Sequence, residues 1–258
     1  MRLHVDRRRL AHGRRQDARL SAREKKRLPD HFGARTATAP YARNDAGHDK
    51  AKRLALWAAY PLHSCYTQGI SRERHWGYDP TLAPGEQMTG GVSAPYNRGH
   101  QVANADRRVS NLANDQISYY SNMTAQRSNF NSGVWAALEG RVRGWMCADT
   151  LYVVTGCHFD GSQTSPIDNG GNTLPVPTQY YKVLLRSKNG STGRSVASLP
   201  ADELQAIGFW YEHTESSGQN PAGCAKSVSE IERLCGFEFF VNVPNAPKAS
   251  YLPSDWGL

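Results

Sequence analysis

Short runs of β-branched and aromatic residues recur along the chain and predict buried strands. Four of them stand between turn-forming residues, at 54–60, 151–155, 180–185 and 206–211. Their length and their β-rich composition are typical of strands inside a sheet. Pro61 directly follows the first run, so we expect that strand to end there.

Two helices are predicted from a different periodicity. One segment has apolar residues at steps of three and four, which would form one helix face over about four turns: Val134, Trp135, Leu138, Val142 and Trp145. A shorter helix is predicted over 227–234, where Ser227 and Glu230 form a capping-box pattern and Gly236 ends the segment. Residues 77–91 are rich in glycine, proline and aspartate and are expected to be a loop.

The order of these elements indicates an α+β fold. Helices stand irregularly among the strands, without the strand–helix–strand period of a doubly wound sheet, and no internal repeat is visible. The chain has 258 residues, of which 39% are hydrophobic and 10% aromatic. Such a chain can form one domain with a single core and an appendage.

The positive charge is concentrated at the N-terminal end. The formal net charge is +8, but residues 1–53 carry 16 Lys/Arg against 6 Asp/Glu, and the rest of the chain carries 15 against 17. Basicity is therefore only weak support for a nucleic-acid substrate, because it belongs to the arm. We expect 1–46 to be a basic, disordered arm or linker and 47–258 to be the folded domain.

Neither a membrane span nor an export signal can be recognised in this sequence. No run approaches the roughly 18 apolar residues that a bilayer requires, and no apolar signal segment follows the basic N-terminus. The five cysteines include no Cys-x-x-Cys pair, which argues against a zinc finger or a thioredoxin-like site. Two disulfides with one free thiol would fit a secreted or periplasmic protein, which we favour; five reduced thiols would fit a cytoplasmic one.

The groups that phosphodiester hydrolysis requires are gathered between Tyr96 and Arg143. His100 is the candidate base, because neutral histidine, with an ordinary pKa of about 6.5, can take a proton from water near physiological pH. Gly99 beside it would let the backbone approach closely or turn. Taken alone, a histidine next to a glycine is more often structural than catalytic.

A polar stripe is predicted on the helix that follows. Asn131 and Glu139 are eight residues apart, about two helical turns, and Arg143 lies about one turn further on. The stripe is either a solvated face with an i,i+4 ion pair, which is the more common case, or one wall of a cleft. Asn129 and Ser132 near the helix start are expected to be helix caps.

This series of motifs resembles the ββα-metal, DNA/RNA non-specific endonuclease family. Residues 97–100 are similar to the family's Asp-Arg-Gly-His, 121–126 to Ser-Asn-Met-Thr-Pro-Gln with Ala125 in place of proline, and 131–139 to Asn-x-Gly-x-Trp-x-x-Leu-Glu. The resemblance extends over 56–244 and includes three later runs, at 152–156, 176–183 and 229–232. It implies an α+β fold with a central, mainly antiparallel sheet flanked by helices and a ββα-metal active-site motif.

The resemblance also implies the chemical roles of the central residues. His100 would be the general base that activates water, and Asn131 would be the one direct protein ligand of Mg²⁺, for which Mn²⁺ could substitute. Glu139 would hold water around the ion, and Asn122 would help to order the site.

The same resemblance assigns arginines to the phosphate. Arg74 and Arg143 would neutralise charge that builds up in the transition state, while Arg98 and Arg127 would bind substrate. The implied substrates are DNA and RNA, cut without sequence preference to leave 5′-phosphate ends. A homodimer and an inhibitor protein are further partners that the sequence leaves open.

Asn97 departs from the family pattern, in which an aspartate stands at this position. An amide keeps the shape and the acceptor oxygen but loses the negative charge, so we expect reduced or retuned rather than lost activity. The alternative is a catalytically weakened or inactive relative that binds nucleic acid through its basic arm. A serine or cysteine hydrolase is disfavoured, because no motif such as Gly-x-Ser-x-Gly is present.

Overall fold

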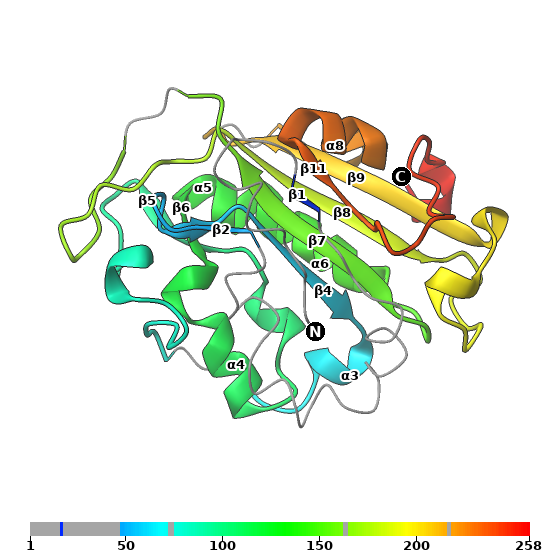
Figure 1. The fold of residues 1–258 in the computed structure, drawn as a ribbon, viewed down its shortest axis with the longest axis horizontal. Helices are drawn as coiled ribbons and strands as arrows, with labels where there is room; N and C mark the ends of the chain where they lie inside the picture. Colours follow the sequence, from blue (N-terminus) through cyan, green and yellow to red (C-terminus); the bar gives the residue numbers. More distant parts are fainter. Residues whose placement is uncertain (1–15, 18–46, 72–74, 162–164, 216–217) are drawn as a thin grey trace.

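A five-stranded sheet forms the centre of the protein (Figure 1). The computed structural model describes residues 16–17, 47–71, 75–161, 165–215 and 218–258. All neighbouring strands of the sheet are antiparallel, in the spatial order β10 (Ala225–Lys226), β9 (Leu204–Glu212), β8 (Gln179–Ser187), β7 (Leu151–His158) and β4 (Trp57–Leu62). The predicted α+β fold with a central antiparallel sheet is confirmed.

Helices cover both faces of this sheet because its strands are apolar on both sides. Along β8, Leu184 belongs to one hydrophobic core and its neighbours Val183 and Leu185 to another. The first core contains the apolar side of α6 (Ala136–Gly144), and the second contains that of α8 (Val228–Cys235). β7 and β8 are therefore buried almost throughout, as predicted for central strands.

Pro61 does not end the first strand, so this prediction is wrong. β4 continues through it to Leu62, and Pro61 lies opposite Tyr152 of β7. β4 pairs with β7 alone and forms the edge of the sheet. Proline is tolerated at an edge because its missing N–H removes no bond to a second neighbour.

The predicted ββα unit is present beside this sheet. β5 (Tyr96–His100) and β6 (Met123–Arg127) form an antiparallel pair in which His100 lies opposite Met123. A helical segment follows β6 directly and consists of α5 (Ser128–Phe130), the π-helical turn η6 (Asn131–Trp135) and α6. The connection between the strands contains η4 (Asn104–Asp106), α4 (Asn111–Ile117) and η5 (Tyr120–Asn122).

The helix predicted from apolar residues 134–145 begins earlier than expected, at Ser128. Its expected caps are also wrong: Asn129 donates to Glu215, and the Ser132 hydroxyl donates to the carbonyl of Ser128. α8 is confirmed, with a capping box at its start and a left-handed glycine at its end.

The remaining elements are short. They are β2 (His48–Asp49), β3 (Leu54–Ala55), α3 (Ser64–Thr67), η3 (Pro84–Glu86), η7 (Val196–Ser198), η8 (Ala201–Glu203), α7 (Pro221–Cys224), β11 (Phe237–Glu238) and η9 (Pro253–Trp256). The predicted arm 1–46 lies outside the described residues except for β1 (Gln16–Asp17), which pairs in parallel with β11. No helix in the described part of the chain is long and apolar enough to cross a membrane.

All five cysteines are free thiols, so the favoured prediction of two disulfides is wrong. Burial raises the pKa of Cys157 and Cys235 to about 12, which keeps both thiols protonated at neutral pH.

Candidate active site

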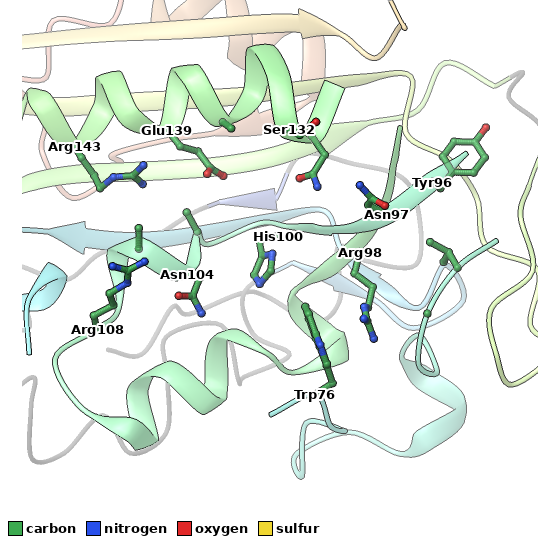
Figure 2. A pocket seen from close by; sticks show the side chains of 16 residues that line it. Trp76, Tyr96, Asn97, Arg98, His100, Asn104, Arg108, Ser132, Glu139 and Arg143 are labelled. Atoms are coloured by element: carbon green, nitrogen blue, oxygen red, sulfur yellow. The ribbon is translucent and has the colours of Figure 1, made fainter. Parts of the chain in front are cut away.

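A cavity of about 590 Å³ lies between β5, the segment that follows it and the helical segment of the ββα unit (Figure 2). Three arginines and one glutamate are its charged side chains, together with His100. Its wall consists of Trp76, Gly91, Val92, Tyr96, Asn97, Arg98, His100, Ala103, Asn104, Ala105, Arg108, Asn131, Ser132, Ala136, Glu139 and Arg143.

His100 reaches this cavity from the end of β5. Gly99 before it is buried, and a Cβ at this position would overlap the side chain of Gln126 on β6. Only glycine therefore allows the two strands to pair this closely, as the sequence predicted. The imidazole lies 5.6 Å from the ring of Trp76, centroid to centroid.

The polar stripe of the helix forms the opposite wall of the cavity, so it is not a solvated face. Asn131, Glu139 and Arg143 all line the cavity, and Figure 2 shows Glu139 and Arg143 extending into it from α6. Two turns of a regular α-helix take about 7.2 residues, so a spacing of eight would rotate Asn131 away from Glu139. The π-helical turn that begins at Asn131 takes up about one extra residue and restores the alignment.

A buried carboxylate holds Arg143 in place. Asp106 is 2% exposed and accepts hydrogen bonds from the Arg143 guanidinium (3.0 Å) and from the Tyr60 hydroxyl (2.8 Å). Burial, and next the charge of Asp106, raise the pKa of Tyr60 well above its ordinary value, so Tyr60 stays a donor. The sequence analysis missed Asp106, because its partners lie 37 and 46 residues away.

Lys182 lies behind the same wall, in the middle of β8. It is 1% exposed, its Nζ donates to the Thr155 hydroxyl (3.1 Å), and it lies 4.5 Å from the Trp135 ring centroid. Burial lowers the pKa of Lys182, whereas the nearby carboxylates of Glu139 and Asp106 oppose this shift. The sequence carried a signal for it, since a lysine inside an otherwise apolar strand needs a partner.

Asn122 does not line the cavity. It is fully buried, and its amide accepts from the backbone N–H of Val102 and donates to the carbonyls of Val102 and Ile117. It therefore joins the segment after His100 to the end of α4.

The predicted arginines have different positions. Arg98 lines the cavity with its guanidinium 3.9 Å from the ring centroid of Trp76. Arg127 is not part of the wall; its guanidinium pairs with Glu215 at 2.9 Å. Arg74 lies outside the described residues.

Asn104 and Arg108 are two further wall residues that the sequence analysis missed. They follow β5 after a short connection, and no local pattern marks them as site residues. Their position depends on how the chain folds back after His100.

Comparisons with known proteins place the chain among nucleases. A family model of DNA/RNA non-specific endonucleases matches residues 24–246. A nuclease of Serratia marcescens is 25% identical over 213 residues, which cover 79% of this chain and 74% of that protein. The mitochondrial nuclease EXOG of Homo sapiens is 25% identical over 214 residues, covering 78% and 56%. A nuclease of Syncephalastrum racemosum is 32% identical over 165 residues, covering 56% and 52%.

The fold is also similar to that of a solved structure, a chain in the crystal structure of the EndoG/EndoGI complex. The TM-score is 0.61 at 21% sequence identity, with 79% of this chain and 88% of that chain covered. At this identity the similarity concerns the fold alone. The family match, by contrast, spans most of the chain and the whole cavity wall. The chain therefore belongs to the DNA/RNA non-specific endonuclease family.

Proposed function

We propose that this protein is a metal-dependent endonuclease that hydrolyses phosphodiester bonds of DNA and RNA and leaves 5′-phosphate ends. One observation carries the proposal: a histidine on β5 shares a cavity with Asn131, Glu139 and Arg143 on the facing helix. A base, oxygen donors and a cation are what attack of water on a phosphodiester requires.

The donor set of the cavity fits a hard divalent cation. Asn131 and Glu139 contribute amide and carboxylate oxygens, and Asn97 adds another amide. Among the described residues, no three His, Cys, Asp or Glu side chains are grouped to hold a metal. A sparse oxygen site suits Mg²⁺, which retains most of its water, and Mn²⁺ could substitute. When bound, the ion supplies Lewis-acid polarisation of a phosphoryl oxygen and neutralises charge on the leaving 3′ oxygen.

His100 would act as the general base. Its ring accepts a proton from the attacking water as the new phosphorus–oxygen bond forms, and the bond to the 3′ oxygen breaks. Asn131 would hold the ion through its amide oxygen, and Glu139 would accept hydrogen bonds from the water around it. Asn122 would act as a positioning residue, because its amide is used by backbone groups beneath the site.

The arginines of the wall would bind the phosphate. Arg143, held by Asp106, is oriented before substrate arrives and would stabilise charge on the non-bridging oxygens. Arg98 would contact the strand at the end of the cavity near Trp76. Contacts to phosphate carry no sequence information, which fits a non-specific enzyme.

Asn97 fits reduced or retuned rather than lost activity in this proposal. It is exposed, and its amide still offers an acceptor oxygen to the cavity. The alternative is a non-catalytic binder that uses its basic arm. In such a protein, the orientation of Arg143 by buried Asp106 would serve no catalytic step.

The partners and the location stay predictions. The complex of EndoG with EndoGI makes an inhibitor protein a reasonable partner to search for, and a homodimer can be tested by sedimentation. Relatives include mitochondrial nucleases. Since all five thiols are free, secretion or a periplasmic location loses the support that disulfides would have given.

A digestion series tests the proposal. Supercoiled plasmid and a single-stranded RNA are incubated with the protein in Mg²⁺, Mn²⁺, Ca²⁺ or EDTA, and ligation tests the products for 5′-phosphates. We expect cleavage of both substrates with Mg²⁺ or Mn²⁺ and none with EDTA. His63→Ala, which lies outside the cavity wall, should cleave at the wild-type rate. The absence of cleavage by folded protein in every metal would overturn the proposal.

A further inference from the structure

The cavity extends past His100 on the side away from Arg98 and Trp76. Figure 2 shows Asn104 and Arg108 on that side, with Arg143 on the wall above them. A nucleic-acid strand whose scissile phosphate lies at His100 must continue beyond it in both directions. This end of the cavity is therefore positioned to contact a neighbouring nucleotide.

The amide of Asn104 has a defined orientation. Asn114 donates its Nδ2 to the carbonyl of Arg107 (3.1 Å), so its Oδ1 is left as an acceptor. Asn104 donates its Nδ2 to that oxygen across a long 3.4 Å contact. The Oδ1 of Asn104 must then point the other way, and in Figure 2 it lies on the side of Arg108.

This oxygen is an acceptor without a donor. Asn104 is 5% exposed, and its Oδ1 has no hydrogen-bond partner among the described residues. A buried carbonyl without a donor costs about 1–3 kcal/mol. The oxygen is closed to solvent in this structure, so a ligand that brings a donor offsets the cost once the Asn104 side chain shifts toward the cavity that it lines.

Arg108 adds a charge to the same end of the cavity. Its Nε is buried and has no acceptor within the described part of the chain. Arg143 nearby is already paired with Asp106. Arg108 is thus the arginine at this end that a second phosphate can engage.

Only one group of the sugar–phosphate backbone suits the Asn104 oxygen. Phosphate and ring oxygens are acceptors, and an internal deoxyribose has no hydroxyl. Ribose carries a 2′-hydroxyl, which can donate. Base amino groups also donate, but contacts to them would bring sequence preference.

We propose that Asn104 and Arg108 form a subsite for the nucleotide next to the cleaved bond, in which Arg108 binds its phosphate and the Asn104 amide oxygen accepts the 2′-hydroxyl of ribose. The inference rests on the proposed nuclease function. It makes Asn104 a specificity residue that favours ribose at one position, in an enzyme that cuts both nucleic acids.

A ribonucleotide scan tests the role of Asn104. End-labelled DNA strands that each carry one ribonucleotide are cut with Mg²⁺, and cleavage at every linkage is resolved on a gel. We expect wild-type protein to cut one linkage near the ribonucleotide about 3- to 10-fold faster than in all-DNA, the range of one neutral hydrogen bond. A 2′-O-methyl group, which cannot donate, should abolish the gain, as should Asn104→Ala.

The outcomes separate the hypotheses. No cleavage of any strand by wild-type protein would reject the nuclease function itself. If wild-type protein cleaves the strands but cuts no linkage near the ribonucleotide faster than in all-DNA, the subsite is rejected, whether or not the variant folds. A gain that persists in Asn104→Ala also rejects it. If Asn104→Ala slows all linkages equally and raises the Mg²⁺ requirement, the oxygen faces the hydrated ion, and the ribose assignment is wrong.

Binding without metal tests Arg108. The affinity of a labelled 12-nucleotide RNA is measured by fluorescence anisotropy in EDTA at several salt concentrations. We expect Arg108→Gln to raise the Kd about 5- to 10-fold and to lower the salt slope by about 0.7, the value of one single-strand phosphate contact. Arg141→Gln, an exposed arginine of α6 outside the cavity wall, should match wild type. Equal effects of both substitutions, or none from Arg108→Gln, would overturn the assignment.

Discussion

Asp106 determines how Arg143, one of the arginines of the cavity wall, is held. A guanidinium on an exposed helix would sample many rotamers, and ordering it on substrate binding would cost side-chain entropy. The buried carboxylate removes this cost, because it fixes Arg143 from one side and is itself fixed by the Tyr60 hydroxyl. The orientation of Arg143, the proposed phosphate-binding group, is thus fixed by a buried carboxylate.

Asp106→Asn should therefore impair catalysis more than folding. The amide can still accept from Tyr60, but it loses the charge-assisted bond to Arg143, and a misplaced catalytic group can cost up to about 100-fold in rate. We expect kcat on plasmid DNA to fall about 10- to 100-fold. Asp202→Asn, at an exposed position, is the control and should keep full activity. Wild-type kcat in Asp106→Asn would refute the role of this pair.

At the scale of elements, the site depends on how the helical segment of the ββα unit is joined to β5 and β6. The strands and α8 could be predicted because their apolar patterns and caps are local. The alignment of Asn131 with Glu139 was predicted as well, but the π-helical turn that produces it was not, since this turn has no sequence signature beyond Gly133, whose backbone is non-helical. The prediction that Pro61 ends the first strand was wrong for a related reason. Proline is tolerated at the edge of a sheet, and which strand lies at the edge depends on the order of all the strands.

His213 joins β6 to the main sheet and should make stability depend on pH. Its Nε2 accepts from the backbone N–H of Arg127 and its Nδ1 donates to Pro177, so the ring must be neutral. Burial lowers the pKa of His213 to about 4. The unfolded chain binds this proton at about pH 6.5, so the stabilisation is complete above that pH and is lost as pH falls toward 4.

Urea unfolding at pH 7 and pH 4.5 measures this effect. The wild-type free energy of unfolding should fall by about 2–3 kcal/mol more than that of His213→Gln, whose amide can make both bonds without titrating. Equal losses of unfolding free energy in the two proteins would show that protonation of His213 does not destabilise the fold.

Lys182 lies between the central sheet and the helical segment that forms one wall of the cavity. A buried ammonium is costly, and a methionine of similar length would avoid the desolvation. We expect Lys182→Met to keep or raise the melting temperature but to lower kcat about 10-fold, because Glu139 loses a nearby positive charge. Lys188→Met, exposed just after β8, should change neither. A lower melting temperature with unchanged kcat would contradict this account.

At the scale of the whole molecule, charge and catalysis belong to different parts of the chain. The excess of Lys and Arg lies in residues 1–53, whereas the cavity wall lies between 76 and 143. The motifs of the sequence identified His100, Asn131, Glu139 and Arg143. Asp106, Asn104 and Arg108 could not be found, because contacts between distant segments determine their positions, whereas Lys182 stood out only as a lysine inside an apolar strand.

Removal of residues 1–46 should therefore separate binding from turnover. We expect the basic arm to attract phosphates at long range, so its loss should raise the Kd for DNA and reduce the salt dependence of binding. Turnover at saturating substrate should stay within about twofold of the full chain, since the wall is intact. No turnover by the full chain, with an affinity for DNA that is lost together with the arm, would favour the binder alternative.

Chemical rescue tests the central claim most directly. His100→Ala removes the proposed base and should lower the Mg²⁺-dependent cleavage rate about 10²- to 10⁴-fold, the usual contribution of a general base. Added imidazole should restore part of this rate in proportion to its neutral fraction, while the wild-type rate does not change. A variant that cleaves at the wild-type rate without imidazole would show that His100 is not the base.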